Sequence, residues 1–131
     1  MSHQAMLSTN DLAVGYRNGK RISTVLEHIN VSLYPGELVC LLGANGIGKS
    51  TLLRTISGVQ SPLTGEITIA GRNIELYSSK ELSKLIGIVY TDRTLAGALT
   101  VEELVSLGRQ PYTGFFGCLD DDDRRVVAEA I

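Results

Sequence analysis

The feature that most constrains the fold is a glycine-rich loop between an apolar run and a helical pattern. Residues 43–50 read GANGIGKS, which is the pattern G-x-x-x-x-G-K-[ST]. The apolar run at residues 38–42 predicts a strand before the loop, and apolar residues after it recur at helical spacing. A strand, this loop and a helix in succession form a site for the phosphates of a nucleoside triphosphate. A glycine-rich turn with a solvated lysine is the alternative, and the complete motif in this setting disfavours it.

Each residue type in the loop has a physical reason to be there. Gly43, Gly46 and Gly48 let the backbone turn tightly and direct N–H groups inward, which makes a concave anion site. The first turn of the following helix adds unpaired N–H groups and the positive end of the helix dipole. Lys49 can reach the β- and γ-phosphates, and the Ser50 hydroxyl can hold Mg²⁺. The sequence therefore predicts binding of a nucleoside triphosphate with Mg²⁺.

Composition and charge narrow the class of protein. The chain has 131 residues, of which 44% are hydrophobic and 20% charged, as expected for one domain with a core. A net charge of −2 gives no surplus of positive charge for binding nucleic acid phosphates. No apolar run is long enough to span a bilayer, and the N-terminus lacks the features of a signal peptide. We therefore expect a cytosolic protein with Cys40 and Cys118 as reduced thiols, and with Cys40 in the core.

Alternation and turn signals divide the chain between strands and helices. Residues 1–34 and 61–75 favour β structure, with the first strand ending at a turn over residues 15–19, and residues 87–90 read as a buried strand. The helix after the loop is expected to end near Gly58, because glycine is favoured just beyond a helix. The pattern therefore mixes β structure with helices, as in an α/β protein.

Capping patterns predict further helices. Ser78 with Glu81, and Thr100 with Glu103, match the capping box that satisfies backbone N–H groups at a helix N-terminus. The second of these helices is expected to end at Gly108. Two short helices are therefore expected after the second β region, one beginning after Ser78 and the other after Thr100.

The acidic run at residues 120–123 has two interpretations. Carboxylates are favourable at the positive end of a helix, so the run predicts the first turn of a last helix. A metal site is the alternative, and the helical interpretation is favoured. The chain stops at Ile131 in the middle of the helical pattern, without a closing glycine or polar tail. We therefore expect the chain to be part of a longer domain.

The order of these features resembles the N-terminal half of the nucleotide-binding domain of ATP-binding cassette (ABC) transporters. The resemblance covers essentially the whole chain. It rests on Tyr16 after the first strand, on the turn PGE at residues 35–37, on the loop GANGIGKSTLLRTISG, and on SPLTGEITIAGRNI, where that family has a β-hairpin. The C-terminal stretch VEELVSLGRQPYTGFFGCLDDDDRRVVAEAI is similar to importers of iron–siderophore, haem or cobalamin complexes.

The resemblance implies a fold class and a division of the chain. We expect a truncated α/β fold of the P-loop NTPase, ABC type, with an antiparallel β subdomain beside the phosphate-loop core and the start of a helical subdomain. The β subdomain would comprise residues 1–37 and 61–76. The phosphate-loop core would comprise residues 38–60 and 77–92, and the helical subdomain would begin in residues 93–131.

The resemblance also implies roles for individual residues. Tyr16 matches the aromatic residue that stacks on adenine, and a turn tyrosine packed on the sheet is the alternative. Lys49 matches the lysine on the β- and γ-phosphates, Ser50 the Mg²⁺ ligand, and Thr51 the residue that bonds the α-phosphate. The remaining residues of the expected ATP cradle are Gly43, Asn45, Gly46, Ile47 and Gly48.

One residue departs from the family pattern. The family has a glutamine after the strand at residues 86–89 that touches Mg²⁺ and the attacking water, and Thr91 holds that position here. Thr91 is therefore the candidate catalytic replacement beside Lys49, Asp92 is a second candidate, and a simple loop start is the alternative. The family's signature loop, strand-end glutamate and switch histidine are absent from the sequence. We therefore expect this chain to bind ATP without efficient turnover.

The resemblance implies a role in import across a membrane. We expect the full-length protein to couple ATP hydrolysis to import of an iron complex or cobalamin through membrane permease subunits, with a substrate-binding protein as an indirect partner. It would act as a homodimer, held by the permease at the inner face of the membrane. The alternative is a soluble ABC ATPase that acts on nucleic acid or ribosomes, and the net charge of −2 disfavours it.

Overall fold

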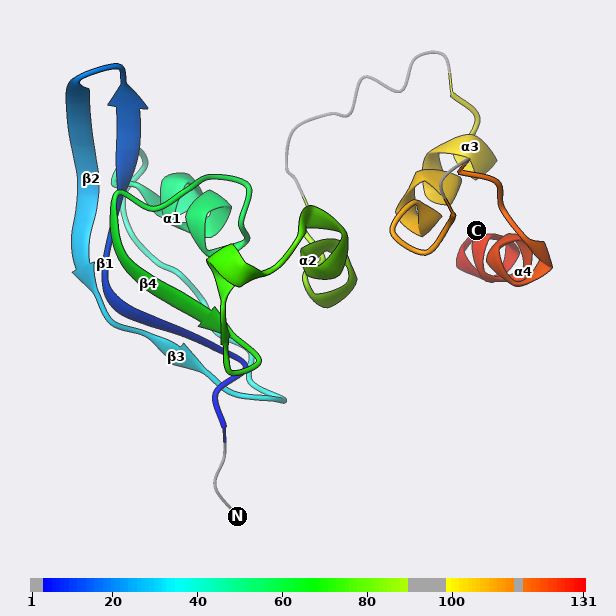
Figure 1. Ribbon diagram of the computed structural model, residues 1–131, viewed down its shortest axis with the longest axis horizontal. Helices are drawn as coiled ribbons and strands as arrows, with labels where there is room; N and C mark the ends of the chain where they lie inside the picture. Colours follow the sequence, from blue (N-terminus) through cyan, green and yellow to red (C-terminus); the bar gives the residue numbers. More distant parts are fainter. Residues whose placement is uncertain (1–3, 90–98, 115–116) are drawn as a thin grey trace. The chain divides into compact units, whose positions relative to one another are not determined.

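The computed structural model describes residues 4–89, 99–114 and 117–131, which divide into the units Met1–Leu82 and Ser83–Ile131. The first unit holds an antiparallel sheet with a helix against it, and the second holds two helices that lie side by side (Figure 1). In the parts of the chain that the structure describes, no helix is long and apolar enough to cross a bilayer. The predictions for Tyr90, Thr91 and Asp92 lie outside the described residues.

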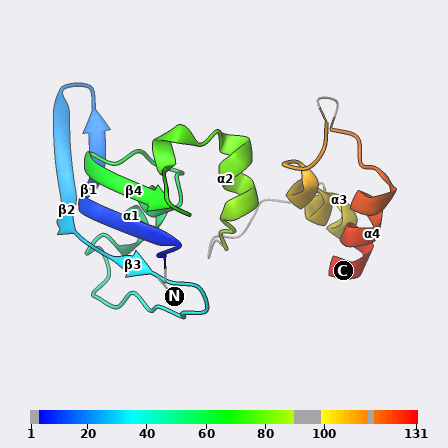
Figure 2. The ribbon, with the colours of Figure 1, turned by 60° about the horizontal axis from the view of Figure 1, so that its bottom comes forward.

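One long strand, β1, organises the first unit. Its C-terminal part pairs with β2, and its N-terminal part pairs with β4 and β3, all antiparallel (Figure 2). The short strand β5 extends the sheet beyond β4. This sheet confirms the β structure predicted for the two β regions of the sequence. The strands are β1 (Leu7–Asn18), β2 (Arg21–Ile29), β3 (Ser32–Leu33), β4 (Thr64–Ile69) and β5 (Arg72–Asn73).

A bulge at Asp11 lets β1 change partners. Its pairing with β4 shifts register between Asn10 and Ala13, and Asp11 itself has φ 45°. Gly65 faces this bulge with φ 85°, and a Cβ atom there would lie 2.4 Å from the main-chain oxygen of Asp11. Only glycine fits at this close approach of β4 to β1. The apolar core forms next to it, and its residues are Leu12, Ala13, Val14, Leu52, Ile67, Ile69 and Ile74.

Strand β1 is longer than the sequence predicts. A turn was expected over residues 15–19, whereas β1 continues to Asn18 and the turn lies at Gly19 and Lys20. The reason is pairing across the hairpin, where Gly15 is opposite Thr24 and the ladder continues to the end of the strand. Tyr16 is therefore a strand residue with a fixed backbone.

Helix α1 (Lys49–Ile56) begins at the end of the phosphate loop and packs against β1. It buries one face, which carries Thr51, Leu52 and Thr55. Beyond its C-cap, Gly58 has φ 77°, the left-handed conformation that ends many helices. The predicted helix and its predicted end are both confirmed. The 3-10 turn η1 (Ile74–Leu76) follows β5 and contributes Ile74 to the core.

The predicted strand at residues 38–42 is wrong. The segment has no regular secondary structure, and Leu38 and Leu42 are 93% and 88% exposed. Within the described residues no strand pairs with it, and a parallel strand forms only with neighbours that satisfy its N–H and C=O groups. Cys40 is accordingly exposed rather than in the core, although it is a free thiol as predicted.

The strand predicted at residues 87–90 is also wrong for residues 87–89, which are the part that the structure describes. No described strand pairs with them. Residues 87–89 have no regular structure, and Val89 is 97% exposed. The helix that precedes this segment, α2 (Ser79–Leu85), is present as predicted, with the Ser78 hydroxyl bonded to the main-chain N–H of Glu81.

The second unit confirms two predicted helix starts. Thr100 with Glu103 forms a capping box at α3 (Val101–Ser106), and Asp120 with Asp123 forms one at α4 (Asp121–Ala130). The acidic run is thus the first turn of a helix. Gly108 does not end α3, because the chain continues as the 3-10 turn η2 (Leu107–Arg109).

Candidate functional site

The phosphate loop is shaped by glycines in the left-handed region. Gly46 has φ 82° and Gly48 has φ 111°, and Gly48 is the N-cap of α1. A Cβ atom on Gly48 would lie 2.5 Å from Cγ1 of Val25 on β2. The loop therefore requires glycine at Gly48 for two reasons, the backbone conformation and the close approach of the hairpin.

The first turn of α1 is the electropositive end of the site. Gly48 makes no side-chain cap, so the N–H groups of Lys49, Ser50 and Thr51 are free of a side-chain acceptor from the N-cap residue. Unpaired N–H groups and the helix dipole together favour an anion at this end of α1. The backbone at the start of α1 thus favours binding of an anion.

Lys49 reaches back over the loop that precedes it. Its Nζ donates hydrogen bonds to the main-chain oxygens of Gly43 at 2.6 Å and Ala44 at 2.8 Å. An ammonium group has three N–H donors, and these two bonds leave one donor for a ligand oxygen. The lysine therefore closes the loop and still presents positive charge to an anion at the start of α1.

Tyr16 reaches the site from the sheet. Its phenol oxygen lies 3.0 Å from Oγ1 of Thr51 in the first turn of α1, and either hydroxyl can be the donor. The tyrosine remains about half exposed, at 47%. The side chain therefore bridges the strand and the loop helix and keeps an accessible ring surface beside the anion site.

These groups line one cavity of about 300 Å³. It brings together most of the residues that the sequence singled out, although they come from β1, the loop and α1. Gly43 and Ile47 do not line it. The main-chain oxygen of Gly43 accepts a hydrogen bond from Lys49, and Ile47 is 53% exposed. Thr91 lies outside the described residues. The lining consists of Tyr16, Val25, Asn45, Gly46, Gly48, Lys49, Ser50 and Thr51.

Val25 was missed as a site residue. The sequence placed it among the apolar residues of a half-buried strand, without a role at the loop. Its position follows from the hairpin register, which sets Leu26 opposite Val14 and brings β2 against Gly48. No local signal in the sequence reports that register, because it depends on the length of β1 and on its bulges.

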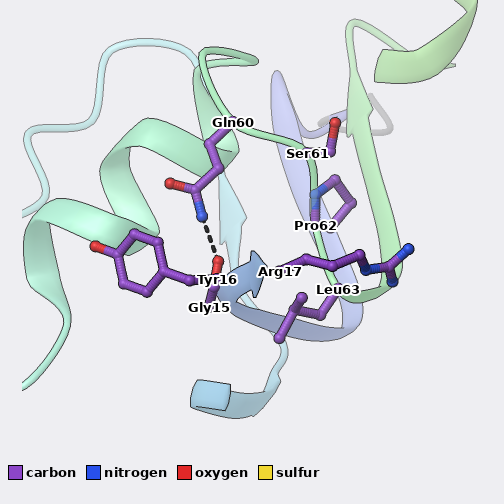
Figure 3. A pocket seen from close by; sticks show the side chains of 7 residues that line it. All are labelled: Gly15, Tyr16, Arg17, Gln60, Ser61, Pro62 and Leu63. Atoms are coloured by element: carbon purple, nitrogen blue, oxygen red, sulfur yellow. Dashed lines mark hydrogen bonds between the residues drawn. The ribbon is translucent and has the colours of Figure 1, made fainter. Parts of the chain in front are cut away.

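A second cavity of about 530 Å³ is also lined by Tyr16. It is formed by the end of β1 and the loop between α1 and β4, and Tyr16 belongs to both cavities. Figure 3 shows its lining side chains, among which Gln60 bonds the main-chain oxygen of Gly15. Its lining residues are Gly15, Tyr16, Arg17, Gln60, Ser61, Pro62 and Leu63.

Comparison with known proteins identifies relatives of this arrangement. Residues 26–131 match the protein family described as "ABC transporter". The chain is 38% identical over 125 residues to "Iron(3+)-hydroxamate import ATP-binding protein FhuC" of Bacillus subtilis, covering 95% of this chain and 45% of the relative. It is 38% identical over 127 residues to "Ferric enterobactin transport ATP-binding protein FepC" of Escherichia coli, covering 97% and 45%.

Solved structures show the same fold. The structure described as "Dimeric Structure of MJ0796, a Bacterial ABC Transporter Cassette" superposes with a TM-score of 0.74 at 29% identity, over 92% of this chain and 53% of that chain. The structure of cbiO1 from Clostridium perfringens gives a TM-score of 0.65 at 31% identity, over 93% and 47%. The expected fold class, with its antiparallel β subdomain, is thereby confirmed. The chain spans less than half the length of the two curated relatives and about half that of the two structures.

Proposed function

The chain belongs to the ABC transporter family, and on that premise we propose that it binds ATP with Mg²⁺ as the ATP-binding part of an importer. The observation that carries the proposal is the cavity shared by the loop, Lys49, the start of α1 and Tyr16. This cavity combines an anion site with an exposed aromatic ring, which are the two chemistries that a nucleotide needs.

The residues present fit both ATP and Mg²⁺. The third donor of Lys49 and main-chain N–H groups between Asn45 and Thr51 would hold the phosphates, with the Thr51 hydroxyl at the α-phosphate. The N–H of Ile47 is not among them, because it donates to the main-chain oxygen of Ala44 at 3.4 Å. The exposed Ser50 hydroxyl would be the protein ligand of Mg²⁺. Bound there, the metal would neutralise part of the phosphate charge.

Tyr16 would supply the platform for the base. Its ring is held on β1 and its hydroxyl is bonded to Thr51, so the ring keeps a fixed distance from the phosphate end of the site. Stacking on adenine then requires no rearrangement of the strand. The alternative role, a tyrosine packed on the sheet, fits less well with a side chain that is 47% exposed.

We propose the same division of the chain that the sequence suggests. Residues 1–37 and 61–76 form the β subdomain, residues 38–60 and 77–92 belong to the phosphate-loop core, and residues 93–131 begin the helical subdomain. The continuous antiparallel sheet of β1 to β5 supports the β subdomain, and the neighbouring helices α3 and α4 support a helical subdomain in residues 93–131.

The transported cargo is proposed from the relatives. The names of two of them specify import of iron(3+)-hydroxamate and transport of ferric enterobactin, and a third, from Halobacterium salinarum, is a "Cobalamin import ATP-binding protein BtuD" with 37% identity over 107 residues. That match covers 82% of this chain and 26% of the relative. The full-length protein would therefore drive import of an iron complex or cobalamin.

The partners would be permease subunits and a second copy of the full-length domain. A dimeric cassette is among the matched structures, and the permease would hold the protein at the inner face of the membrane. The 131-residue chain would bind nucleotide without efficient turnover, because the family's glutamine is replaced by Thr91 and its later catalytic groups are not in this sequence.

Reconstitution of the full-length protein tests the transport role. Placed in vesicles with the permease encoded beside its gene, the protein is expected to hydrolyse ATP and to drive uptake of the ferric or cobalt complex. Hydrolysis should depend on Lys49, and Lys49→Ala should abolish both activities while Lys20→Ala, at the exposed hairpin turn, should leave them unchanged. Absence of ATP-dependent uptake with every permease encoded nearby would refute the importer role.

A further inference from the structure

We propose that Gln60 is a positioning residue, which holds the backbone of Tyr16 where its ring can stack on a nucleobase. The inference rests on the proposed function of Tyr16. Nε2 of Gln60 donates a hydrogen bond to the main-chain oxygen of Gly15, a residue 45 positions away in the sequence. Figure 3 shows the amide of Gln60 directed at the main-chain oxygen of Gly15, next to the ring of Tyr16.

The backbone before Tyr16 is a place where a support is needed. The pairing of β1 with β2 shifts register between Val14 and Gly15, so the regular ladder is interrupted there. A Cβ atom on Gly15 would lie 2.1 Å from the main-chain oxygen of Ser23, so this position is confined to glycine. Glycine is the residue with the greatest backbone freedom, and an external hydrogen bond restricts it.

Gln60 is itself anchored to α1. Its N–H donates to the main-chain oxygen of Arg54 at 3.1 Å, in the turn that follows Gly58. The Tyr16 hydroxyl is bonded to Thr51 at the other end of the same helix. The segment around Tyr16 is therefore tied to both ends of α1, and α1 is the helix that begins at the phosphate loop.

The two hydrogen bonds, Gln60 to Gly15 and Tyr16 to Thr51, hold the strand beside a cavity. The end of β1 and the loop between α1 and β4 together line a cavity of about 530 Å³. Besides the Gln60 bond, the N–H of Leu63 donates to the oxygen of Ala13 at 2.9 Å, earlier on the strand. β2 pairs with the strand at Tyr16, and the Gln60 bond ties the same segment to the C-terminal end of α1. This second tie fixes the distance between the base platform and the phosphates. Such preorganisation strengthens binding of a ligand that uses both ends of the site.

Comparing the binding of two ligands distinguishes a positioning role of Gln60 from a general effect on the structure. MgATP uses the platform and the phosphate loop, whereas tripolyphosphate with Mg²⁺ uses the loop alone. Gln60→Met keeps the side-chain length and removes the donor, and it is expected to weaken MgATP binding about 3- to 10-fold. Its affinity for tripolyphosphate should stay within about 2-fold of that of the unaltered chain, since the loop is untouched.

Three further variants complete the experiment on the 131-residue chain. Gln60→Lys restores a donor at this position and should recover the preference for ATP over tripolyphosphate. Tyr16→Ala should lose that preference, and adding Gln60→Met to it should cause no further loss, because both act through the same ring.

The outcomes distinguish this inference from the function on which it rests. An equal loss of both ligands in Gln60→Met, or an unchanged affinity for MgATP, would overturn the positioning role and leave the nucleotide site standing. Equal binding of MgATP and tripolyphosphate by the unaltered chain would also overturn it, because the platform would then add nothing. If the unaltered chain binds neither ligand, the proposed function fails and the role of Gln60 fails with it.

Discussion

The phenol oxygen of Tyr16 lies 3.0 Å from Oγ1 of Thr51, so a side chain of the sheet is bonded to the first turn of the loop helix. The two residues are 35 positions apart in the sequence, and they meet because β1 continues past the turn expected at Gly15. This contact joins an aromatic ring to an anion site. It makes the aromatic residue and the phosphate loop parts of one site.

Substitution of Tyr16 separates the ring from the hydroxyl. Tyr16→Ala removes the platform and is expected to weaken MgATP binding about 3- to 10-fold. Tyr16→Phe keeps the ring and loses only the bond to Thr51, so its affinity should stay within about 2-fold. Titration with a fluorescent ATP analogue measures both. Equal affinities for Tyr16→Ala and the unaltered chain would instead support a tyrosine that only packs on the sheet.

Glycine substitutions in the loop should differ in cost. Gly48→Ala places a Cβ atom 2.5 Å from Cγ1 of Val25 at φ 111°, and is expected to lower the free energy of unfolding by about 1–3 kcal/mol. Gly46→Ala meets only backbone strain, since no atom lies within 4 Å, and should cost about 1–2 kcal/mol.

Urea unfolding of the single and double variants checks this difference. Adding Val25→Ala to Gly48→Ala should recover part of the lost free energy of unfolding, because it removes Cγ1 of Val25, the atom with which the new Cβ clashes. A double variant whose stability is the simple sum of the two single losses would show that the clash with β2 is not the cause.

The hairpin should carry a pH-dependent contact. Nδ1 of His28 lies 2.7 Å from Oδ1 of Asp11, and this hydrogen bond, with the charges of Asp11 and Glu27, raises the pKa of His28. Stability from the pair is therefore fully present below about pH 6.5, the ordinary value, and is lost as pH rises through the raised pKa. His28→Asn tolerates the local φ of 56° and removes the titration.

Unfolding midpoints in urea, measured from acid to alkaline pH, test the hairpin contact. The stability of the unaltered chain relative to His28→Asn should fall as pH rises across the raised value. Parallel pH profiles of the two proteins would contradict the assignment.

The second unit should depend on one carboxylate. Oδ1 of Asp123 accepts from Nε of Arg109 at 2.6 Å, and this bond lowers the pKa of Asp123. The pair therefore contributes stability above the ordinary pKa of aspartate, and the contribution disappears as pH falls through the lowered value. Arg109→Met should destabilise the unit at neutral pH, and the loss should shrink in acid.

Helical circular dichroism in urea measures this effect. Arg124→Met is the matched control, because Arg124 is an exposed arginine on α4, the helix that carries Asp123. If both substitutions lower stability equally, or if the Arg109 effect is independent of pH, the ion pair is not the source.

Local chemistry made part of the fold predictable from sequence. The phosphate loop, α1 and the helix starts at Ser78, Thr100 and Asp120 depend on residues within a few positions of one another, and the structure contains all of them. Alternation of apolar and polar residues predicted β strands in this region, and the resemblance to the ABC family predicted their antiparallel arrangement.

Features that depend on distant partners were not predictable. Residues 38–42 have the composition of a buried strand, yet no strand pairs with them in the described part of the chain. The roles of Val25 and Gln60 depend on a hairpin register and on a hydrogen bond across 45 positions. Neither leaves a local pattern, because side-chain period alone does not fix register.

Calorimetric titration of the 131-residue chain with MgATP tests the central claim most directly. We expect saturable binding of one nucleotide per chain, unchanged in Lys20→Ala and weakened at least about 10-fold in Lys49→Ala, where the charge over the loop is lost. Lys20 lies at the exposed hairpin turn, so it controls for the removal of one positive charge. An unaltered chain that does not bind MgATP, or equal binding by Lys49→Ala, would contradict the account.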